Sequence, residues 1–296
     1  MRDAKLKNWI DLLTDLIRRT ATDLPPDVAA ALRSSLKAED LDGSACSTLR
    51  TILENADLAR ARTIPMCQDT GTLTFWFEVP HGSDASFYEQ ATCEAVRKAT
   101  ENGWLRLNVL NVPSSTQVSD NVAPGNPTIH IEQCAVDEVK VSLLLKGGGC
   151  ENVSTQYSLP DTGLKAGRDL DGVRRCLLDA IWRAQGRGCA PGILGVCIGG
   201  DRANGYGKAK EQLLRLLPDT SPSPELAELE NRVFAEANTL GIGPMGLGGK
   251  TTLIGVKVTT LPRLPASYFV TVSYSCWACR RQTIFVNLDG HVRDEL

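Results

Sequence analysis

Three cysteines lie in turn-forming segments, where thiols from distant parts of a chain can point toward a shared centre. They are Cys67 in MCQDTGT, Cys189 in GRGCAPG and Cys276 in SYSCWACRR. Three widely separated thiols suit a cubane iron–sulfur cluster in which one iron has no protein thiolate and stays open to substrate. Such an iron is a Lewis acid that can bind a hydroxyl and a carboxylate oxygen and draw hydroxide off a carbon. Most other cysteines, such as Cys93 and Cys176 in helical patterns, are expected to pack as small apolar residues.

The CxxC pair of Cys276 and Cys279 allows another interpretation of the same thiols. A structural zinc site made of four cysteines normally needs a second such pair, and a redox dithiol normally lies at the start of a helix. The sequence has neither context around residues 276–279. A zinc site that uses these two thiols stays open as an alternative to the cluster.

Two glycine-rich loops resemble phosphate-binding motifs, but neither has the full pattern. GPMGLGGKTT has Pro244 where the P-loop needs its first glycine, and it leads into a predicted strand instead of a helix. GGDRANGYGK, residues 199–208, follows a strand and opens a helix, but its spacing is neither the Rossmann nor the Walker pattern. We expect close packing of the chain at both turns rather than nucleotide binding.

Composition excludes several classes of partner. The chain has 296 residues, 42% of them hydrophobic, which is enough for one large domain or two smaller ones with proper cores. The net charge is −3 and the basic residues are scattered, so nucleic acid is not expected as a partner. The first twenty residues have the period of an amphipathic helix, and no charge-free apolar run is long enough to span a bilayer. We therefore expect a soluble, cytoplasmic protein with no membrane partner, whose ten cysteines stay reduced.

Helical and strand patterns alternate along the chain, which predicts an α/β fold with mixed β-sheets flanked by helices. The N-terminal part, about residues 1–62, is predicted to be helical, and residues 1–296 are predicted to form a single catalytic domain. KGGGCEN, residues 146–152, is predicted to be a loop, and Trp182 is placed on the apolar side of its helix. The predicted helices cover 3–20, 25–37, 46–62, 84–102, 169–185, 202–217 and 225–239, and the predicted strands cover 74–79, 128–134, 139–145, 192–200 and 251–260, with two more on either side of the turn at Cys276 and Cys279.

Five motifs occur in the order seen in class I iron–sulfur hydro-lyases: PMCQDTGT, KGGGCEN, CAPGILGVCIGG, GPMGLGGKTT and VSYSCWACRR. From about residue 40 to residue 285 the chain resembles the alpha subunit of the L(+)-tartrate dehydratase and class I fumarate hydratase type. The resemblance implies that Cys67, Cys189 and Cys276 ligate a 4Fe-4S cluster. It also implies reversible trans elimination of water from a 2-hydroxy dicarboxylate, in which the cluster does no redox work.

The same resemblance implies roles for four further residues. Gln68 and Asp69 would face the substrate, and Asp69 is the candidate for handling protons. Arg106 would bind a substrate carboxylate, for which the guanidinium fork is suited. Gly149 would let backbone amides approach the substrate.

Two departures from the family pattern affect this interpretation. Leu264 occupies the position where the family has a histidine, and a leucine can neither transfer a proton nor hydrogen-bond a carboxylate. His81, His130 and His291 all lie outside the family motifs, and each is expected to be a surface or packing residue. Either another group does the work of the missing histidine, or the substrate differs.

The second departure is length. Single-chain class I fumarases carry a further C-terminal domain that contributes to the active site, so we expect a separate beta subunit and a hetero-oligomer of alpha and beta chains. A non-catalytic or sensory iron–sulfur descendant of the family stays open as an alternative, with Leu264 as the mark of lost chemistry.

Overall fold

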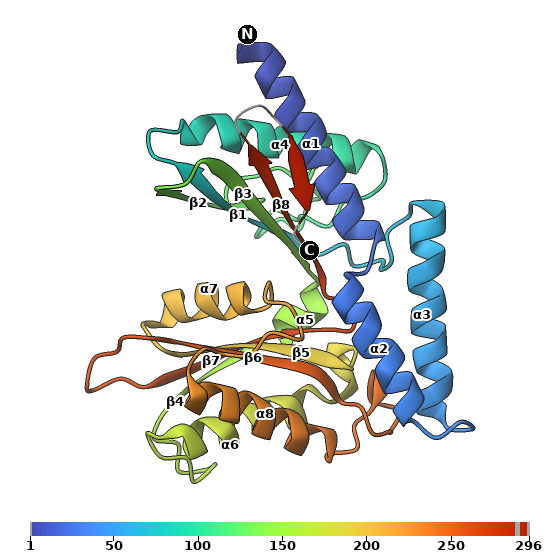
Figure 1. Cartoon of the computed structure of the whole chain (residues 1–296), viewed down its shortest axis with the longest axis vertical. Helices are drawn as coiled ribbons and strands as arrows, with labels where there is room; N and C mark the ends of the chain where they lie inside the picture. The colour runs from blue at the N-terminus through green and yellow to red at the C-terminus, as the bar shows by residue number, and fades with distance from the viewer. Residues whose placement is uncertain (1, 288–290, 295–296) are drawn as a thin grey trace. The chain divides into compact units, whose positions relative to one another are not determined.

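The computed structural model describes residues 2–287 and 291–294, and the chain divides into two compact units that each contain a β-sheet (Figure 1). The first unit consists of Met1–Pro25, Asn55–Gly147 and Arg280–Leu296, and the second of Pro26–Glu54 and Gly148–Cys279. The α/β class with mixed sheets is confirmed, and the single catalytic domain expected for residues 1–296 stays a prediction. Within the described part of the chain, no helix has both the length and the apolar composition needed to cross a membrane.

The sheet of the first unit is mixed, with β2 parallel to β1 and the other neighbours antiparallel. Helices α1 and α4 pack together against one face of this sheet (Figure 1). Side chains alternate between the faces of a strand, so Phe75, Val141 and Ile284 all point into the core beneath these helices. In the described residues the strand order is β2-β1-β3-β8-β9, with the elements α1 (Arg2–Thr22), β1 (Thr72–Pro80), α4 (Ala85–Glu101), β2 (Thr128–Cys134), β3 (Glu138–Lys146), β8 (Arg280–Asn287) and β9 (Val292–Asp294).

The helices of this unit follow from local signals. In α1, Leu13, Leu16 and Ile17 recur at helical spacing and are fully buried, which contributes on the order of 2 kcal/mol each. Helix α4 begins after Asp84, whose side chain accepts a hydrogen bond from a backbone N–H of the first turn. It ends near Gly103, which has a φ of +75° that favours glycine. Both boundaries confirm the sequence prediction.

The second unit contains a smaller mixed sheet with helices on both faces. Strand β5 is central and buried along its whole length, antiparallel to β7 and parallel to β6. Figure 1 shows α7 on one face of this sheet and α6 and α8 on the other. The described strands have the order β4-β7-β5-β6, and the elements are α2 (Pro26–Ala38), α3 (Ser44–Arg62, which continues into the first unit), α5 (Gly148–Asn152), β4 (Thr155–Ser158), α6 (Leu170–Ala184), β5 (Gly192–Gly199), α7 (Arg202–Gln212), α8 (Pro224–Asn238), β6 (Leu253–Leu261) and β7 (Phe269–Ser275), with two 3-10 turns, η1 (Gln185–Gly188) and η2 (Pro244–Gly246).

The structure corrects several sequence predictions. The segment predicted to be a loop at 146–152 contains the one-turn helix α5. Trp182 is 56% exposed, because the apolar stripe of α6 runs through Leu177 and Ile181 and leaves the next residue outside it. Helix α7 ends at Gln212 instead of residue 217, because the N–H groups of Leu213 and Leu214 bond to carbonyls three residues earlier instead of four. The Leu217 N–H donates to an Asp side chain of α2.

Candidate active site

The turn that carries Cys67 lies between α3 and β1 in the first unit. Its buried neighbour Met66 donates its N–H to the Ala21 carbonyl at 3.1 Å and accepts a hydrogen bond from the Asn55 amide at 2.9 Å. These bonds fix the start of the turn to α1 and α3. Cys67 itself is a partly exposed free thiol. Gln68 is exposed, so the turn presents a thiol and an amide side by side.

Asp69 packs against the glycines that follow β3. A Cβ atom at Gly147 would lie 2.7 Å from Asp69 Oδ2, closer than real Cβ atoms approach another atom. On the other side of the turn, Gly71 has a φ of +82°, and a Cβ there would lie 2.6 Å from the Lys146 carbonyl oxygen. Glycine at both positions therefore lets the two motifs approach this closely. The contact holds the Asp69 carboxylate beside the backbone of the glycine loop.

Thr70 joins this turn to the segment that carries Arg106. The buried Thr70 hydroxyl accepts hydrogen bonds from the Arg106 backbone N–H at 3.1 Å and from the Asn108 side-chain amide at 2.9 Å. Arg106 is exposed. The first unit thus brings Gln68, Asp69 and Arg106 into one neighbourhood through a threonine that sequence reasoning did not single out. The only signal for it was its place in the CQDTGT motif.

In the second unit, the loops of Cys189 and Cys276 lie side by side. Cys189 follows η1 in the left-handed conformation (φ 52°, ψ 59°) and donates its N–H to the Gly186 carbonyl at 3.0 Å. Its own carbonyl accepts a hydrogen bond from the N–H of Trp277, the residue after Cys276, at 3.2 Å. Neither cysteine is in a disulfide, and both are partly exposed, as expected for cysteines in loops.

A buried tyrosine ring packs against the glycines next to Cys189. Tyr274, one of the last residues of β7, is 2% exposed. A Cβ at Gly188 would lie 2.5 Å from its ring, and one at Gly192 would lie 2.2 Å from its hydroxyl oxygen. The glycines on both sides of Cys189 therefore make room for this ring. Tyr274 is a second residue of the site region that sequence reasoning missed.

Helix α5 and the residues after it are linked to the backbone of Tyr274. The backbone N–H of Tyr274 donates to the Ser154 hydroxyl at 3.1 Å, and that hydroxyl donates to the Cys150 carbonyl at 2.8 Å. Burial is the main cause that raises the pKa of the phenol, and the thiols of Cys276, Cys150 and Cys189 raise it further. Three thiols of the second unit are therefore close enough to this phenol to influence its pKa.

The space around Gly149 would accommodate a side chain, so packing alone does not require a glycine there. The nearest atom to a Cβ at this position would be the Arg187 carbonyl oxygen, at an ordinary contact distance of 3.9 Å, and Gly149 is exposed. Within residues 2–287 and 291–294, no group of three or more His, Cys, Asp or Glu side chains is arranged to hold a metal ion. Cys279 is fully buried, with its sulfur 4.0 Å from the Leu213 carbonyl oxygen, so it differs in surroundings from its CxxC partner Cys276.

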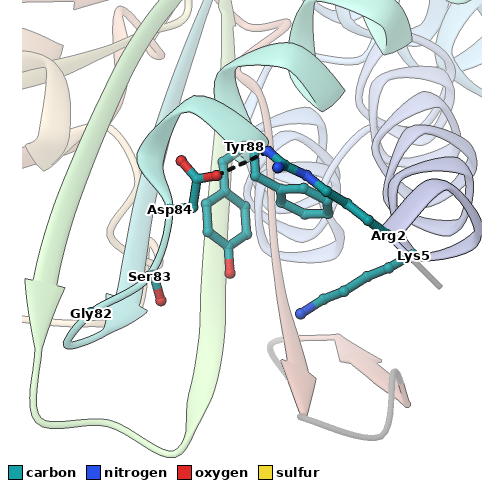
Figure 2. Close-up of a pocket in the computed structure, with 7 residues that line it drawn as sticks. Arg2, Lys5, Gly82, Ser83, Asp84 and Tyr88 are labelled. Atoms are coloured by element: carbon teal, nitrogen blue, oxygen red, sulfur yellow. Dashed lines mark hydrogen bonds and ion pairs between the residues drawn. The ribbon is translucent and has the colours of Figure 1, made fainter.

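A pocket of about 480 Å³ at the start of α4 is distinct from these residues (Figure 2). Its lining includes Gly82 and Asp84, which follow β1, whereas the Cys67 turn precedes β1. An exposed ion pair of 3.1 Å joins Arg2 to Asp84 across its rim, as the dashed line in Figure 2 marks. The pocket is lined by none of the candidate site residues.

Comparison with known proteins identifies the family. The family model described as fumarate hydratase (fumerase) matches residues 10–285. The chain belongs to this fumarate hydratase family. It is 46% identical over 285 residues to a protein of Geobacillus stearothermophilus that is named as a class I fumarate hydratase. That match covers 95% of this chain and 55% of the relative, so the chain spans about half of the relative's length.

Other fumarate hydratase relatives are matched over almost their whole length. An L(+)-tartrate dehydratase subunit alpha of Escherichia coli strain K12 is 28% identical over 98% of this chain and 95% of its own length. A protein of Methanocaldococcus jannaschii, also named as that subunit, is 33% identical over 95% of this chain and 98% of its own length. These names agree with the resemblance drawn from the five motifs.

Class I members of the fumarate hydratase family use an iron–sulfur cluster, and two features of this chain fit such a group. Thiolates, as the three loop cysteines can supply, are the soft ligands that iron–sulfur clusters take. Arg280 is 1% exposed, and its Nε and Nη1 find no hydrogen-bond partner among the described residues. It pairs with Leu145 at the end of the central strand β3, where the Cys67 turn enters the neighbouring strand β1. A buried, unpaired cation costs several kcal/mol, so a negatively charged group is expected beside it.

The position where the family has a histidine lies in the loop between β6 and β7. Leu264 is 75% exposed there, and Figure 1 shows this loop projecting from the end of the second sheet. Arg168 donates hydrogen bonds to the carbonyls of Pro265 and Ala266 at 3.0 and 2.9 Å, which fix the loop. The leucine thus lies on an ordered, exposed loop. Of the histidines, His130 stacks on Trp76 with ring centroids 5.6 Å apart, a packing role as expected.

Proposed function

We propose that this chain is the cluster-bearing alpha-type part of a hydro-lyase that reversibly removes water from a small 2-hydroxy dicarboxylate of the malate or tartrate class. Its membership of the fumarate hydratase family supports this function, and so do the names of its relatives. The observation that carries it is the CQDTG turn, which presents Cys67, Gln68 and Asp69 together and packs against the glycine loop at Gly147. The named relatives are enzymes and lend no support to the non-catalytic alternative.

The proposed cofactor is a 4Fe-4S cluster held by Cys67, Cys189 and Cys276. When bound, this group supplies a Lewis acid for the departing hydroxyl, without a change of oxidation state. The order of the motifs supports this ligand set, together with the partly exposed loop positions of the three cysteines and the two buried guanidinium nitrogens of Arg280 that find no hydrogen-bond partner among the described residues. Both units of the chain then act as one catalytic domain.

Side chains of the protein bind the substrate and accept its proton. Asp69 accepts the proton from the carbon next to the hydroxyl-bearing carbon, and the electron pair of that C–H bond forms the double bond as the C–O bond breaks. The departing hydroxide becomes water by taking up one proton, and the proton that Asp69 releases to solvent restores the carboxylate and the balance. The contact with Gly147 holds its carboxylate in one place, which such a base requires. Arg106 binds one substrate carboxylate through its guanidinium fork.

Gln68 and Gly149 complete the binding of the substrate in this proposal. Gln68 is exposed next to Cys67 and can hydrogen-bond a second carboxylate or a hydroxyl. Gly149 leaves open space around its backbone, so an anionic group can approach the amides of the glycine loop. In this proposal a group other than Leu264 does the work of the family histidine, which is to transfer a proton or hydrogen-bond a carboxylate.

We further propose that a separate beta subunit completes the active site and that the alpha and beta chains form a hetero-oligomer. Support comes from the two relatives that are named as alpha subunits and are matched over almost their whole length. The proposed location is the cytoplasm, a reducing compartment in which thiols that bind a cluster stay reduced.

The test is the dehydration of malate and tartrate by the chain co-produced anaerobically with its beta-type partner. Asp69→Asn should lower kcat by about 10²- to 10⁴-fold, because the amide cannot take the proton. Asp84→Asn, which changes an exposed helix cap, serves as the matched control and should leave kcat within about twofold. Wild-type activity in Asp69→Asn would remove Asp69 from the mechanism, and inactivity of the wild-type complex on every 2-hydroxy dicarboxylate would contradict the function.

A further inference from the structure

The segment that carries Arg106 also exposes three large apolar side chains within six residues. Leu107 is 38% exposed, Leu110 is 52% exposed and Val112 is 92% exposed. Single exposed apolar residues are normal on a protein surface, but a group beside a candidate binding residue marks an interaction site. We call Leu107, Leu110 and Val112 the hairpin surface.

This surface stands on an ordered element. Leu110 and Gln117 form an antiparallel bridge, and the Asn111 N–H donates to the Thr116 carbonyl at 2.8 Å. The Val118 N–H donates to the Val109 carbonyl at 2.9 Å, which closes the hairpin. A partner that docks here therefore loses little free energy in ordering the segment.

The base of the hairpin is tied to the candidate substrate residues by a buried asparagine. Asn121 is 2% exposed, and its side-chain oxygen accepts the Asn108 N–H at 3.1 Å. Its amide nitrogen donates to the Arg106 carbonyl at 2.8 Å. Arg106 in turn is bonded to Thr70, the residue after Asp69. The hairpin surface and the proposed carboxylate-binding residue thus belong to one hydrogen-bonded assembly.

We propose that the hairpin surface is where the beta-type partner docks on this chain. The inference rests on the proposed function. The occupant is a beta-type chain because two relatives that match this chain over almost their whole length are named as alpha subunits. Arg106 is exposed, and a substrate carboxylate bound to it would stay in water, where the ion pair is weak, unless a partner covers it. The apolar side chains next to Arg106 are the area that such a partner buries.

The composition of the segment indicates the chemistry of the partner. Between Glu101 and Asp120 the sequence contains one charged residue, Arg106. The matching face of the partner is therefore apolar, with few charged groups, and surrounds the arginine and its bound carboxylate. Association through such a face changes little with salt, in contrast to docking between charged surfaces.

The experiment uses the full-length chain and, as the probe, the beta-type subunit of the same organism that corresponds to the unmatched part of the longer relative. Isothermal titration calorimetry measures the Kd for wild type, Leu110→Ser, Val112→Ser and the double variant. Each single change should weaken binding about tenfold and the double change about a hundredfold, as expected for apolar interface residues. Raising the salt concentration from 0.1 to 0.5 M, a range in which screening becomes strong, should change the wild-type Kd by less than about threefold.

Leu58→Ser is the matched control, because Leu58 is 45% exposed on α3, outside the hairpin. It should bind within about twofold of wild type. Val112→Arg is a second test that keeps the fold, because the side chain is 92% exposed. It places a charge in the apolar face and should abolish binding. Far-ultraviolet circular dichroism and the Tm of each variant establish that the fold is intact.

The outcomes separate this inference from the proposed function. A double variant that binds the beta-type subunit as tightly as wild type would overturn the docking site, even with full activity in the complex. An isolated chain that dimerises in sedimentation velocity through Leu110 and Val112 would also overturn it, because the occupant would be a second copy. If the variants lose binding but the wild-type complex dehydrates no 2-hydroxy dicarboxylate, the docking site stands and the proposed function fails.

Discussion

Replacing Gly147 with alanine tests how closely the position of the Asp69 carboxylate controls the reaction. The new Cβ would lie 2.7 Å from Asp69 Oδ2 and 3.2 Å from its Cγ, whereas ordinary contact begins at 3.4 Å. The oxygen therefore has to move by about 0.7 Å, the difference between 2.7 and 3.4 Å. The atom that must move is the end of a side chain, so the carboxylate shifts and the backbone stays in place.

A displacement of this size has a predictable effect on rate. Misplacing a catalytic group by about 1 Å can cost about 10²-fold, so Gly147→Ala should lower kcat roughly ten- to hundredfold. Stability should fall by less than about 1.5 kcal/mol, because the strain is confined to one side-chain rotamer. The assay is steady-state dehydration by the anaerobic complex with the beta-type subunit, with iron content and Tm measured on the same preparation.

Gly207→Ala is the matched control, since a Cβ at Gly207 meets no atom within 4 Å and the position lies within α7. It should leave kcat unchanged and raise Tm slightly, because alanine favours a helix over glycine. A Gly147→Ala enzyme with wild-type kcat would refute the claim that Asp69 must be held in place. Loss of iron in this variant would mean that the substitution acts on the cluster and not on the base.

Three further substitutions test the packing of a glycine, a hydrogen bond and a helix cap. Gly192→Ala should destabilise the chain by roughly 1–3 kcal/mol, measured by urea unfolding, because its Cβ would overlap the buried Tyr274 ring, whose hydroxyl oxygen lies 2.2 Å away; unchanged stability would contradict the packing. Thr70→Val should raise KM about tenfold with little effect on kcat, because it loses the hydrogen bond to the Arg106 segment, and Thr70→Ser should restore it; equal KM values would contradict this. Hydrogen bonds from the backbone at the start of α7 lower the pKa of Asp201. Its cap therefore stabilises the fold fully above about pH 4, and this stabilisation is lost as the pH falls through the lower pKa of the folded state. Asp201→Ala should flatten that part of the dependence of Tm on pH, and an unchanged slope would contradict the cap.

Helices and their ends are the part of this fold that local sequence reasoning predicts best. The cap at Asp84 and the stop at Gly103 act within one turn of the helix that they delimit, so a short stretch of sequence contains the whole signal. The apolar residue type of Trp182 favours the buried side of α6, whereas its angular position on the helix places it outside the buried stripe. Periodicity was the better guide there.

Sheet membership could not be predicted in the same way. Strands β7 and β8 flank one short turn, but β7 pairs with β5 and β8 pairs with β3, in different sheets. Pairing depends on partners more than a hundred residues away in β3, a contact that no local pattern records. The short edge strands β4 and β9 were not predicted, for the same reason.

The sequence likewise predicts only part of the candidate site. The thiols of Cys67, Cys189 and Cys276 could be predicted to lie in loops, because glycine, proline or polar residues surround them, and the structure confirms this. Thr70 and Tyr274 could not be found, because their roles come from contacts with residues distant in the sequence. Residue type identifies groups that can do chemistry, whereas the residues that position them become visible only in the fold.

The most direct test of the central claim is the iron and acid-labile sulfide content per chain after anaerobic purification. Wild type should hold about four of each, and Cys67→Ala, Cys189→Ala and Cys276→Ala should each lose the cubane. Cys134→Ala, which removes a partly exposed thiol in β2 outside the motifs, should keep it. A wild-type chain that is folded but contains no iron, or a cluster that survives in all three variants, would contradict the account.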